Sequence, residues 1–173
     1  MESLWNERDA RAAVQRYADQ GVGEDLALRT YSARLLGREP RLVLHGGGNT
    51  SVKTRMRDVF GEDVGVLCVK GSGWDLASIE PAGHPAVRLE PLLRLRGQDR
   101  LSDEDMVSAQ RQCLLDPSAP NPSVETQLHA FIGEKFVDHT HSPAVLALAD
   151  QPDAAKVFED IFRSRTTSVD YVP

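Results

Sequence analysis

The sequence predicts an α/β protein folded as a single domain over residues 1–173. Two N-terminal segments carry apolar residues at helical spacing, and the middle of the chain holds short apolar runs typical of strands. A chain of 173 residues suits one domain, and folding at this size buries roughly 70% of the surface that the unfolded chain exposes. Neither an internal repeat nor a domain linker divides the sequence.

The composition favours a soluble globular protein, with 40% hydrophobic and 27% charged residues. The net charge is -6 without a block of Lys and Arg, so we expect no nucleic-acid partner. No apolar run approaches the roughly 20 residues of a membrane span, and the N-terminus lacks signal-peptide features. We therefore expect no membrane partner and a cytoplasmic location. Cys68 and Cys113 are expected to be reduced, buried packing residues.

The first elements are justified by periodicity and by their terminators. Residues 6–20 and 24–36 read as helices, because apolar residues recur on one stripe and glycines follow each segment. Residues 41–45 read as a short buried strand. Residues 52–60 and 64–70 then predict an antiparallel hairpin around a Gly-Glu-Asp turn.

The later elements are less regular. Residues 77–98 hold several prolines and predict an irregular connection with one short strand near 86–89 and an exposed loop histidine, His84. A helix is expected from Leu101 to Leu114, where Ser102 and the acidic residues after it suit capping. The remaining expected elements are helices over 142–148 and 154–165 and a strand over 166–171.

The stretch around Glu125 carries the first candidate chemistry. Asn121 suits an N-cap and Pro122 a first helical position, so the helix is expected to run from Ser123 to Lys135. Glu125 and His129 would then lie one turn apart on one face. A carboxylate in this position can act as a base beside a bound divalent cation, because the cation stabilises the anion left by proton removal.

The next stretch carries a pair of candidate metal ligands. Phe136 to His141 reads as a short strand, in which His139 and His141 point to the same side with backbones about 6 to 7 Å apart. Two imidazoles so placed can bind one metal ion. A histidine on a strand is more often a hydrogen-bonded structural residue, so the neighbouring motifs decide between these interpretations.

Two small-residue turns suit an anion. Gly46-Gly47-Gly48-Asn49-Thr50-Ser51 combines glycines, which let the backbone approach a ligand, with polar donors. Lys70-Gly71-Ser72-Gly73-Trp74 is a second such turn. Neither matches the nucleoside-triphosphate P-loop or the dinucleotide fingerprint. Each could also be a plain flexible turn.

Taken together, these motifs resemble the class II aldolase/adducin family, most closely the rhamnulose-1-phosphate aldolase-like half of bifunctional aldolase/short-chain dehydrogenases. The resemblance rests on four motifs in the family's order, within residues 41–152. They are Gly47-Gly48-Asn49-Thr50-Ser51, Gly71-Ser72-Gly73, Pro122-Ser123-Val124-Glu125 with His129, and His139-Thr140-His141. It implies a three-layer α/β/α sandwich around a mixed, largely antiparallel sheet, here truncated at the C-terminus, and often a homotetramer.

The resemblance also implies roles for individual residues. It makes Glu125 the acid/base and His139 and His141 ligands of Zn²⁺. The residues that it implies for binding the substrate phosphate are Gly48, Asn49, Ser72, Gly73 and Ser123. The implied reaction is zinc-dependent cleavage of a ketose 1-phosphate, such as rhamnulose 1-phosphate, to dihydroxyacetone phosphate and an aldehyde. A pentulose-phosphate 4-epimerase and a non-catalytic adducin-like binding module are the alternatives.

One departure from the family pattern concerns the metal. Family members supply a third zinc histidine downstream of His-x-His, and no histidine follows His141 here. Of the remaining histidines, His45, His84 and His129, none matches that ligand, although His129 could be recruited. Catalytic zinc normally has three protein ligands. We therefore expect a fragment that binds zinc weakly or not at all and is inactive alone, with NAD relevant only if a dehydrogenase half follows.

Overall fold

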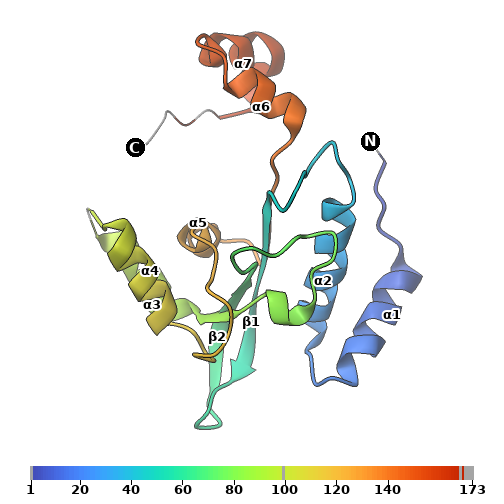
Figure 1. Ribbon diagram of the computed structural model, residues 1–173, viewed down its shortest axis with the longest axis vertical. Helices are drawn as coiled ribbons and strands as arrows, with labels where there is room; N and C mark the ends of the chain where they lie inside the picture. Colours follow the sequence, from blue (N-terminus) through green and yellow to red (C-terminus); the bar gives the residue numbers. More distant parts are fainter. Residues whose placement is uncertain (1, 99, 168, 170–173) are drawn as a thin grey trace.

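A four-stranded sheet forms the centre of the computed structural model, which describes residues 2–98, 100–167 and 169. The strands are β1 (Asn49–Arg57), β2 (Asp63–Val69), β3 (Ala86–Arg88) and β4 (Phe136–His139). Their order is β3-β2-β1-β4, and each of these three pairings is antiparallel. β1 and β2 form the hairpin expected from the sequence (Figure 1). β4 pairs with the other edge of β1.

Helices cover both faces of this sheet, which confirms the expected three-layer α/β/α arrangement (Figure 1). α1 (Glu7–Ala18) packs on α2 (Glu24–Gly37), and α2 packs on β1. On the opposite side, α3 and α5 contact β2, with α4 beside them. The remaining helices are α3 (Leu89–Arg94), α4 (Asp103–Gln112), α5 (Thr126–Phe131), α6 (Pro143–Ala149) and α7 (Ala154–Phe162), with short 3-10 turns at Pro81–Gly83, Leu95–Gly97 and Arg163–Arg165.

The core has two sides because successive strand residues point to opposite faces of the sheet. Leu67 and Val69 of β2 join the cluster beneath α3 and α5. Val66 and Cys68, which alternate with them along the strand, pack on the other face with Leu26 of α2. Burial raises the pKa of the Cys68 thiol to about 12, and Cys113 is also buried and unpaired, so both cysteines behave as packing residues as expected.

Several sequence expectations about secondary structure were wrong. Residues 41–45 form turns rather than a strand, because the chain there reverses direction into the glycine-rich loop, with His45 at a φ of 48°. The helix expected over residues 123–135 is only α5, with Glu125 as its N-cap residue. The connection over 77–98 contains the short helix α3, which accommodates Pro91 in its first turn, where a missing N–H costs no helical bond.

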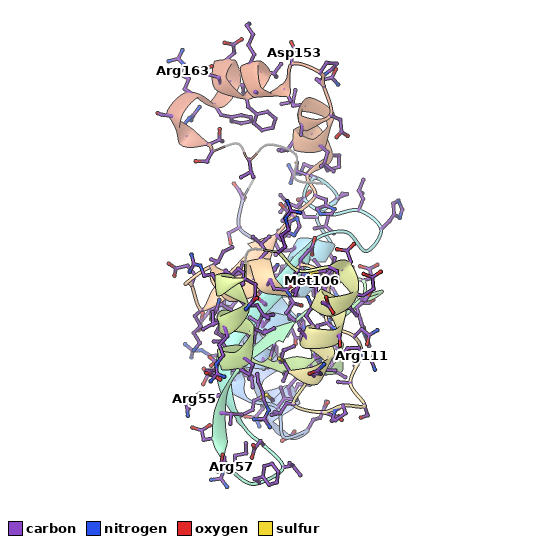
Figure 2. The ribbon with its side chains drawn as sticks, turned by 90° about the vertical axis from the view of Figure 1, so that its left-hand side faces the viewer. Arg55, Arg57, Met106, Arg111, Asp153 and Arg163 are labelled. Carbon is purple, nitrogen blue, oxygen red and sulfur yellow. The ribbon has the colours of Figure 1, made fainter. Side chains whose placement is uncertain are left out.

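α6 and α7 form a separate helical pair beyond the end of the sheet. Figure 2 shows Asp153 and Arg163, at the two ends of α7, far from Met106 and Arg111 of α4, while Arg55 and Arg57 mark the opposite end of the molecule. No side chain within α6 or α7 is buried. Of the strand expected over residues 166–171, positions 168, 170 and 171 lie outside the described residues, and positions 166, 167 and 169 are not in a strand. Within the described part of the chain, no helix is long and apolar enough to cross a membrane.

Candidate active site

β1 presents a row of polar side chains to the face covered by α5. Asn49 contacts Glu125, and both Ser51 and Lys53 contact His129 of α5. The residues between them, Thr50 and Val52, face the other side of the sheet. This follows from the two-residue repeat of a strand. Asn49 is also paired directly across the sheet with His139. Cross-strand partners share a face, so the register alone brings Asn49 and His139 together.

α5 presents Glu125 and His129 to the same place. The Glu125 carbonyl accepts the backbone N–H of His129 at 3.1 Å, the four-residue spacing that stacks two residues on one helix face. At the other end of α5, the Lys53 ammonium donates to the carbonyls of His129, Ile132 and Glu134 at 2.7 to 2.9 Å. These contacts satisfy carbonyls that a helix end leaves free, and they tie α5 to β1.

The Glu125 carboxylate is held on both oxygens. Oε2 accepts hydrogen bonds from Asn49 Nδ2 at 2.8 Å and from Ser123 Oγ at 3.3 Å, and Oε1 lies 3.1 Å from His139 Nδ1. The contact with His139, helped by the Asn49 and Ser123 bonds, lowers the pKa of Glu125 to about 2 against the opposing effect of burial. The same contact raises the pKa of His139. Glu125 is therefore charged at neutral pH and can accept a proton.

His129 is a fully buried imidazole fixed at one nitrogen only. Its Nδ1 lies 2.8 Å from Ser51 Oγ, in hydrogen-bonding contact. Its Nε2 is buried and has no hydrogen-bond partner among the described residues. Burial lowers the pKa of His129 to about 4, although Glu125 opposes this shift. The ring is therefore neutral at pH 7 and offers an unpartnered nitrogen.

His141 lies against His139 even though β4 ends at His139 rather than at residue 141 as expected. The Nε2 atoms of the two rings are 3.1 Å apart. The glycine-rich loop lies close behind, because a Cβ at Gly47 would be only 3.2 Å from His141 Nδ1. The two histidines of the His-x-His motif therefore lie together on one side, as the sequence indicated, but His141 stands in the irregular segment after β4 rather than in the strand.

The donor set near Glu125 fits a divalent transition metal. One donor atom each from Glu125, His129 and His139 lie within 4.8 Å of one another. His139 Nδ1, like His129 Nε2, is buried and makes no hydrogen bond of good geometry with a described residue, despite its short distance to Glu125. Two imidazoles and a carboxylate are a common ligand set for zinc. In the sequence, the four-residue spacing of His129 from Glu125 indicated that the two share a helix face, but it did not identify His129 as a metal ligand.

The glycine-rich loop approaches the histidines as closely as glycine permits. Gly46 and Gly48 have φ values of 77° and 72°, the left-handed region that favours glycine. A Cβ at Gly48 would also lie 2.8 Å from the His139 carbonyl oxygen. The loop is therefore built to pass directly over the end of β4.

Lys70 joins the two small-residue turns to the stretch that carries Ser123, although the sequence gave it no role as a site residue. Its buried ammonium donates to the carbonyls of Gly46 and Gly48 at 2.7 and 3.0 Å, and its own carbonyl accepts the Ser123 N–H at 3.2 Å. The backbone of Ser72 donates to Asn121 at 2.9 Å. Burial lowers the pKa of Lys70. The residues expected to bind phosphate are thus brought to one region, with Ser72 and Gly73 exposed and Gly48 and Asn49 buried.

His84 is buried, not exposed as expected. Its Nε2 lies 3.1 Å from Thr50 Oγ1, on the face of β1 opposite Glu125. The loop after β2 folds back over this face, and the glycine and the proline beside His84 gave no sign of that. Burial, with a further contribution from Arg29, lowers the pKa of His84 to about 3.

An α/β/α sandwich that brings a carboxylate, imidazoles and a glycine-rich loop to one end of its sheet is what the resemblance to the class II aldolase/adducin family led us to expect. Comparison with known families agrees: residues 29–172 match the family described as the class II aldolase and adducin N-terminal domain. The chain belongs to that family.

Two individual proteins are similar to the chain. A solved structure, the N-terminal class II aldolase domain of a conserved protein from Thermoplasma acidophilum, superposes with a TM-score of 0.78 at 37% identity, covering 93% of this chain and 70% of that one. A curated relative, the uncharacterized oxidoreductase YuxG of Bacillus subtilis, is 38% identical over 142 residues. That match covers 82% of this chain but 21% of the relative, so the chain spans about a fifth of it.

Proposed function

We propose that this domain cleaves a carbon–carbon bond of a ketose 1-phosphate, of the rhamnulose 1-phosphate type, to give dihydroxyacetone phosphate and an aldehyde. Glu125 is the acid/base: its carboxylate accepts a proton in one direction and returns it to carbon in the other. A zinc ion bound at the histidines would supply Lewis-acid stabilisation of the negative charge, worth several kcal/mol. Membership of the class II aldolase family supports this class of lyase.

The phosphate is proposed to bind where the small-residue motifs meet. Gly48, Asn49, Ser72, Gly73 and Ser123 supply backbone N–H groups and polar side chains. The Lys70 ammonium beneath the glycine-rich loop adds a positive charge that favours an anion there.

One observation carries the proposal: Asn49 joins the two halves of the site. It follows Gly48 in the loop, lies opposite His139 in the sheet, and donates to Glu125 Oε2 at 2.8 Å. The acid/base, the histidines and the anion-binding loop are therefore held in one fixed relation. Such fixed positioning of substrate and catalytic groups is a major source of rate enhancement.

The test measures proton transfer first, because this half of the reaction needs no aldehyde. The zinc-loaded chain is incubated with dihydroxyacetone phosphate in D₂O, and exchange of a hydroxymethyl proton is followed by NMR. Glu125→Gln should slow the exchange about 100-fold or more, since a positioned acid/base contributes 10²–10⁴-fold. Glu159→Gln, an exposed glutamate of α7, is the matched control and should exchange at the normal rate. Equal rates for Glu125→Gln and the wild-type chain would refute the assignment of Glu125.

Substrate choice is then decided by direct comparison. Cleavage of rhamnulose 1-phosphate is expected, whereas interconversion of ribulose 5-phosphate with its 4-epimer would identify a pentulose-phosphate 4-epimerase. These assays use the full-length parent protein with its zinc content measured. If the zinc-loaded parent catalyses neither reaction, nor the proton exchange, an adducin-like binding module is favoured.

The remaining expectations concern the protein beyond this domain. The name of the Bacillus subtilis relative, an oxidoreductase of which the matched region is about a fifth, supports fusion to an NAD-dependent dehydrogenase half. We also propose that the domain assembles as a homo-oligomer.

A further inference from the structure

We infer that Lys53 is a positioning residue for Glu125: its ammonium anchors α5 to β1 and thereby fixes where the Glu125 carboxylate stands. The ammonium contacts backbone carbonyls at the far end of α5 rather than the carboxylate itself. The inference rests on the proposed function, because it gives Lys53 a part in the proton transfer that is assigned there to Glu125.

The apolar packing of α5 holds the helix over β2 and β3 but not against β1. Ala130 of α5 lies in a buried cluster with Leu67 and Val69 of β2 and Val87 of β3. Within the described part of the chain, no residue of β1 belongs to that cluster. Because apolar burial is non-directional, this packing alone does not fix how far α5 reaches toward β1.

Polar side chains of β1 supply the missing restraint. Asn49 Nδ2 donates to Glu125 Oε2 at 2.8 Å, and Ser51 Oγ lies 2.8 Å from His129 Nδ1. Both contacts join β1 to side chains of the candidate site. Lys53, the next residue on this face of β1, is different because it binds the backbone of α5 and of the segment that follows.

The Lys53 ammonium uses its full donor capacity on that backbone. It has three N–H groups, and it donates to the carbonyls of His129, Ile132 and Glu134 at 2.9, 2.7 and 2.8 Å. A helix leaves its last carbonyls free, and a cation is favoured beside them. The backbone N–H of Lys53 also donates to the Lys135 carbonyl at 2.8 Å, directly before β4. One residue therefore holds both the end of α5 and the start of β4.

Loss of the ammonium should therefore disturb catalysis more than substrate binding. The segment 132–135 joins α5 to β4, and without Lys53 its carbonyls must find other partners, which frees α5 to move relative to β4. A displacement of about 1 Å can cost up to 100-fold in rate. Four of the five residues proposed to bind phosphate lie outside α5 and this segment, in the loops that Lys70 joins: Gly48, Asn49, Ser72 and Gly73.

The experiment follows exchange of the hydroxymethyl proton of dihydroxyacetone phosphate in D₂O, in the zinc-loaded full-length parent protein and its variants. Lys53→Met should lower kcat about ten-fold or more and change KM by less than about two-fold. Lys53→Arg should recover part of the rate, because a guanidinium keeps the charge but its planar fork does not converge on three carbonyls as an ammonium does. Zinc content is measured for every variant, and rates are compared per bound zinc.

Two controls separate positioning from a loss of charge or of stability. Lys135→Met removes an ammonium from the same region, but one that pairs with Asp25 at 2.7 Å instead of with carbonyls of α5. Leu26→Ala destabilises the opposite face of the sheet, where Leu26 is buried. Both variants should exchange at nearly the wild-type rate under conditions in which circular dichroism shows them to be folded.

A double variant tests whether Lys53 acts through Glu125. If it does, adding Lys53→Met to Glu125→Gln should lower the residual exchange by less than about two-fold, because residues that act as a unit are not additive. The inference is overturned if Lys53→Met exchanges like Lys135→Met, if its loss lies in KM rather than kcat, or if the double variant loses a further ten-fold. Should Lys53→Met not fold, a wild-type rate in Lys53→Arg would overturn it equally.

The same measurements distinguish failure of this inference from failure of the proposed function. Slow exchange in Glu125→Gln with normal exchange in Lys53→Met would remove the role of Lys53 and leave the acid/base assignment standing. Normal exchange in Glu125→Gln would remove the assignment of Glu125 and the inference with it.

Discussion

Asp138→Asn should destabilise this protein far more than a matched change in an exposed ion pair. Arg29 of α2 is buried beneath the sheet, with its side chain 1% exposed, and its Nη2 lies 2.6 Å from Asp138 Oδ1. Its Nη1 donates to the backbone carbonyls of Ser51 and Val137 at 3.3 and 3.5 Å. Arg29 therefore ties β1 and β4 together directly beside His139, and Asp138 supplies the charge that compensates it.

The magnitude follows from the burial of the two partners. Removing one member of a buried ion pair costs about 3 to 5 kcal/mol, because the other charge is left without its partner. Asp138 is 47% exposed, so solvent screens part of the interaction, and we expect a loss of about 2 kcal/mol. The control is Asp160→Asn in α7, whose pair with Lys156 is 76% and 64% exposed and should contribute less than about 0.5 kcal/mol.

Urea unfolding at low and high salt measures both changes. The Asp138→Asn loss should persist in about 1 M NaCl, where the Debye length is near 3 Å and exposed pairs are screened. A free energy of unfolding for Asp138→Asn within about 0.5 kcal/mol of the Asp160→Asn value would refute the reasoning.

Three further outcomes are expected. Between pH 6.5 and 3 His84 binds a proton in the unfolded chain but not in the folded chain, so the free energy of unfolding decreases as the pH is lowered, by up to about 1.4 kcal/mol per pH unit. His84→Asn should reduce this dependence in urea unfolding at pH 7, 6 and 5, and an equal dependence in the variant and the wild-type chain would contradict the prediction. Lys70→Met loses the hydrogen bonds to the glycine-rich loop and should weaken the binding of inorganic phosphate about ten-fold or more, because hydrogen bonds to charged groups contribute about 1.5 to 3 kcal/mol. Calorimetry measures this affinity, and an unchanged affinity would show that Lys70 does not contribute to the anion site. Cys68 should react with a thiol reagent only as the chain unfolds, and fast labelling of the native protein would show that the Cys68 side chain is not buried.

The sequence predicted the N-terminal helices and the central hairpin because their signals are local, whereas the three-layer arrangement was implied by the family resemblance. Apolar residues at helical spacing identified α1 and α2, and the apolar run over residues 64–70 identified β2, whose two faces are both buried. Ser102 caps α4 as its sequence indicated. The family motifs also named Glu125 and His139, and the structure brings these two together at 3.1 Å.

Local signals failed where a contact distant in the sequence decided the outcome. Residues 41–45 have the apolar content of a strand but form turns, and Lys70 binds the glycine-rich loop that directly follows them. The helix begun at Thr126 ends at Phe131, where Lys53 binds the carbonyls that follow it. His84 looked exposed because its neighbours are a glycine and a proline, whereas its partner Thr50 lies 34 positions away.

By itself, the sequence determined which kinds of side chain are available and on which faces of helices and strands they lie, since these depend on backbone periodicity. Only the tertiary structure decided which of them meet. His129 joins Glu125 and His139 because the register of β1 against β4 and the seating of α5 on β1 fix their separation. Those separations depend on contacts between residues up to about ninety positions apart, such as Asn49 and His139, which no pattern along the chain encodes.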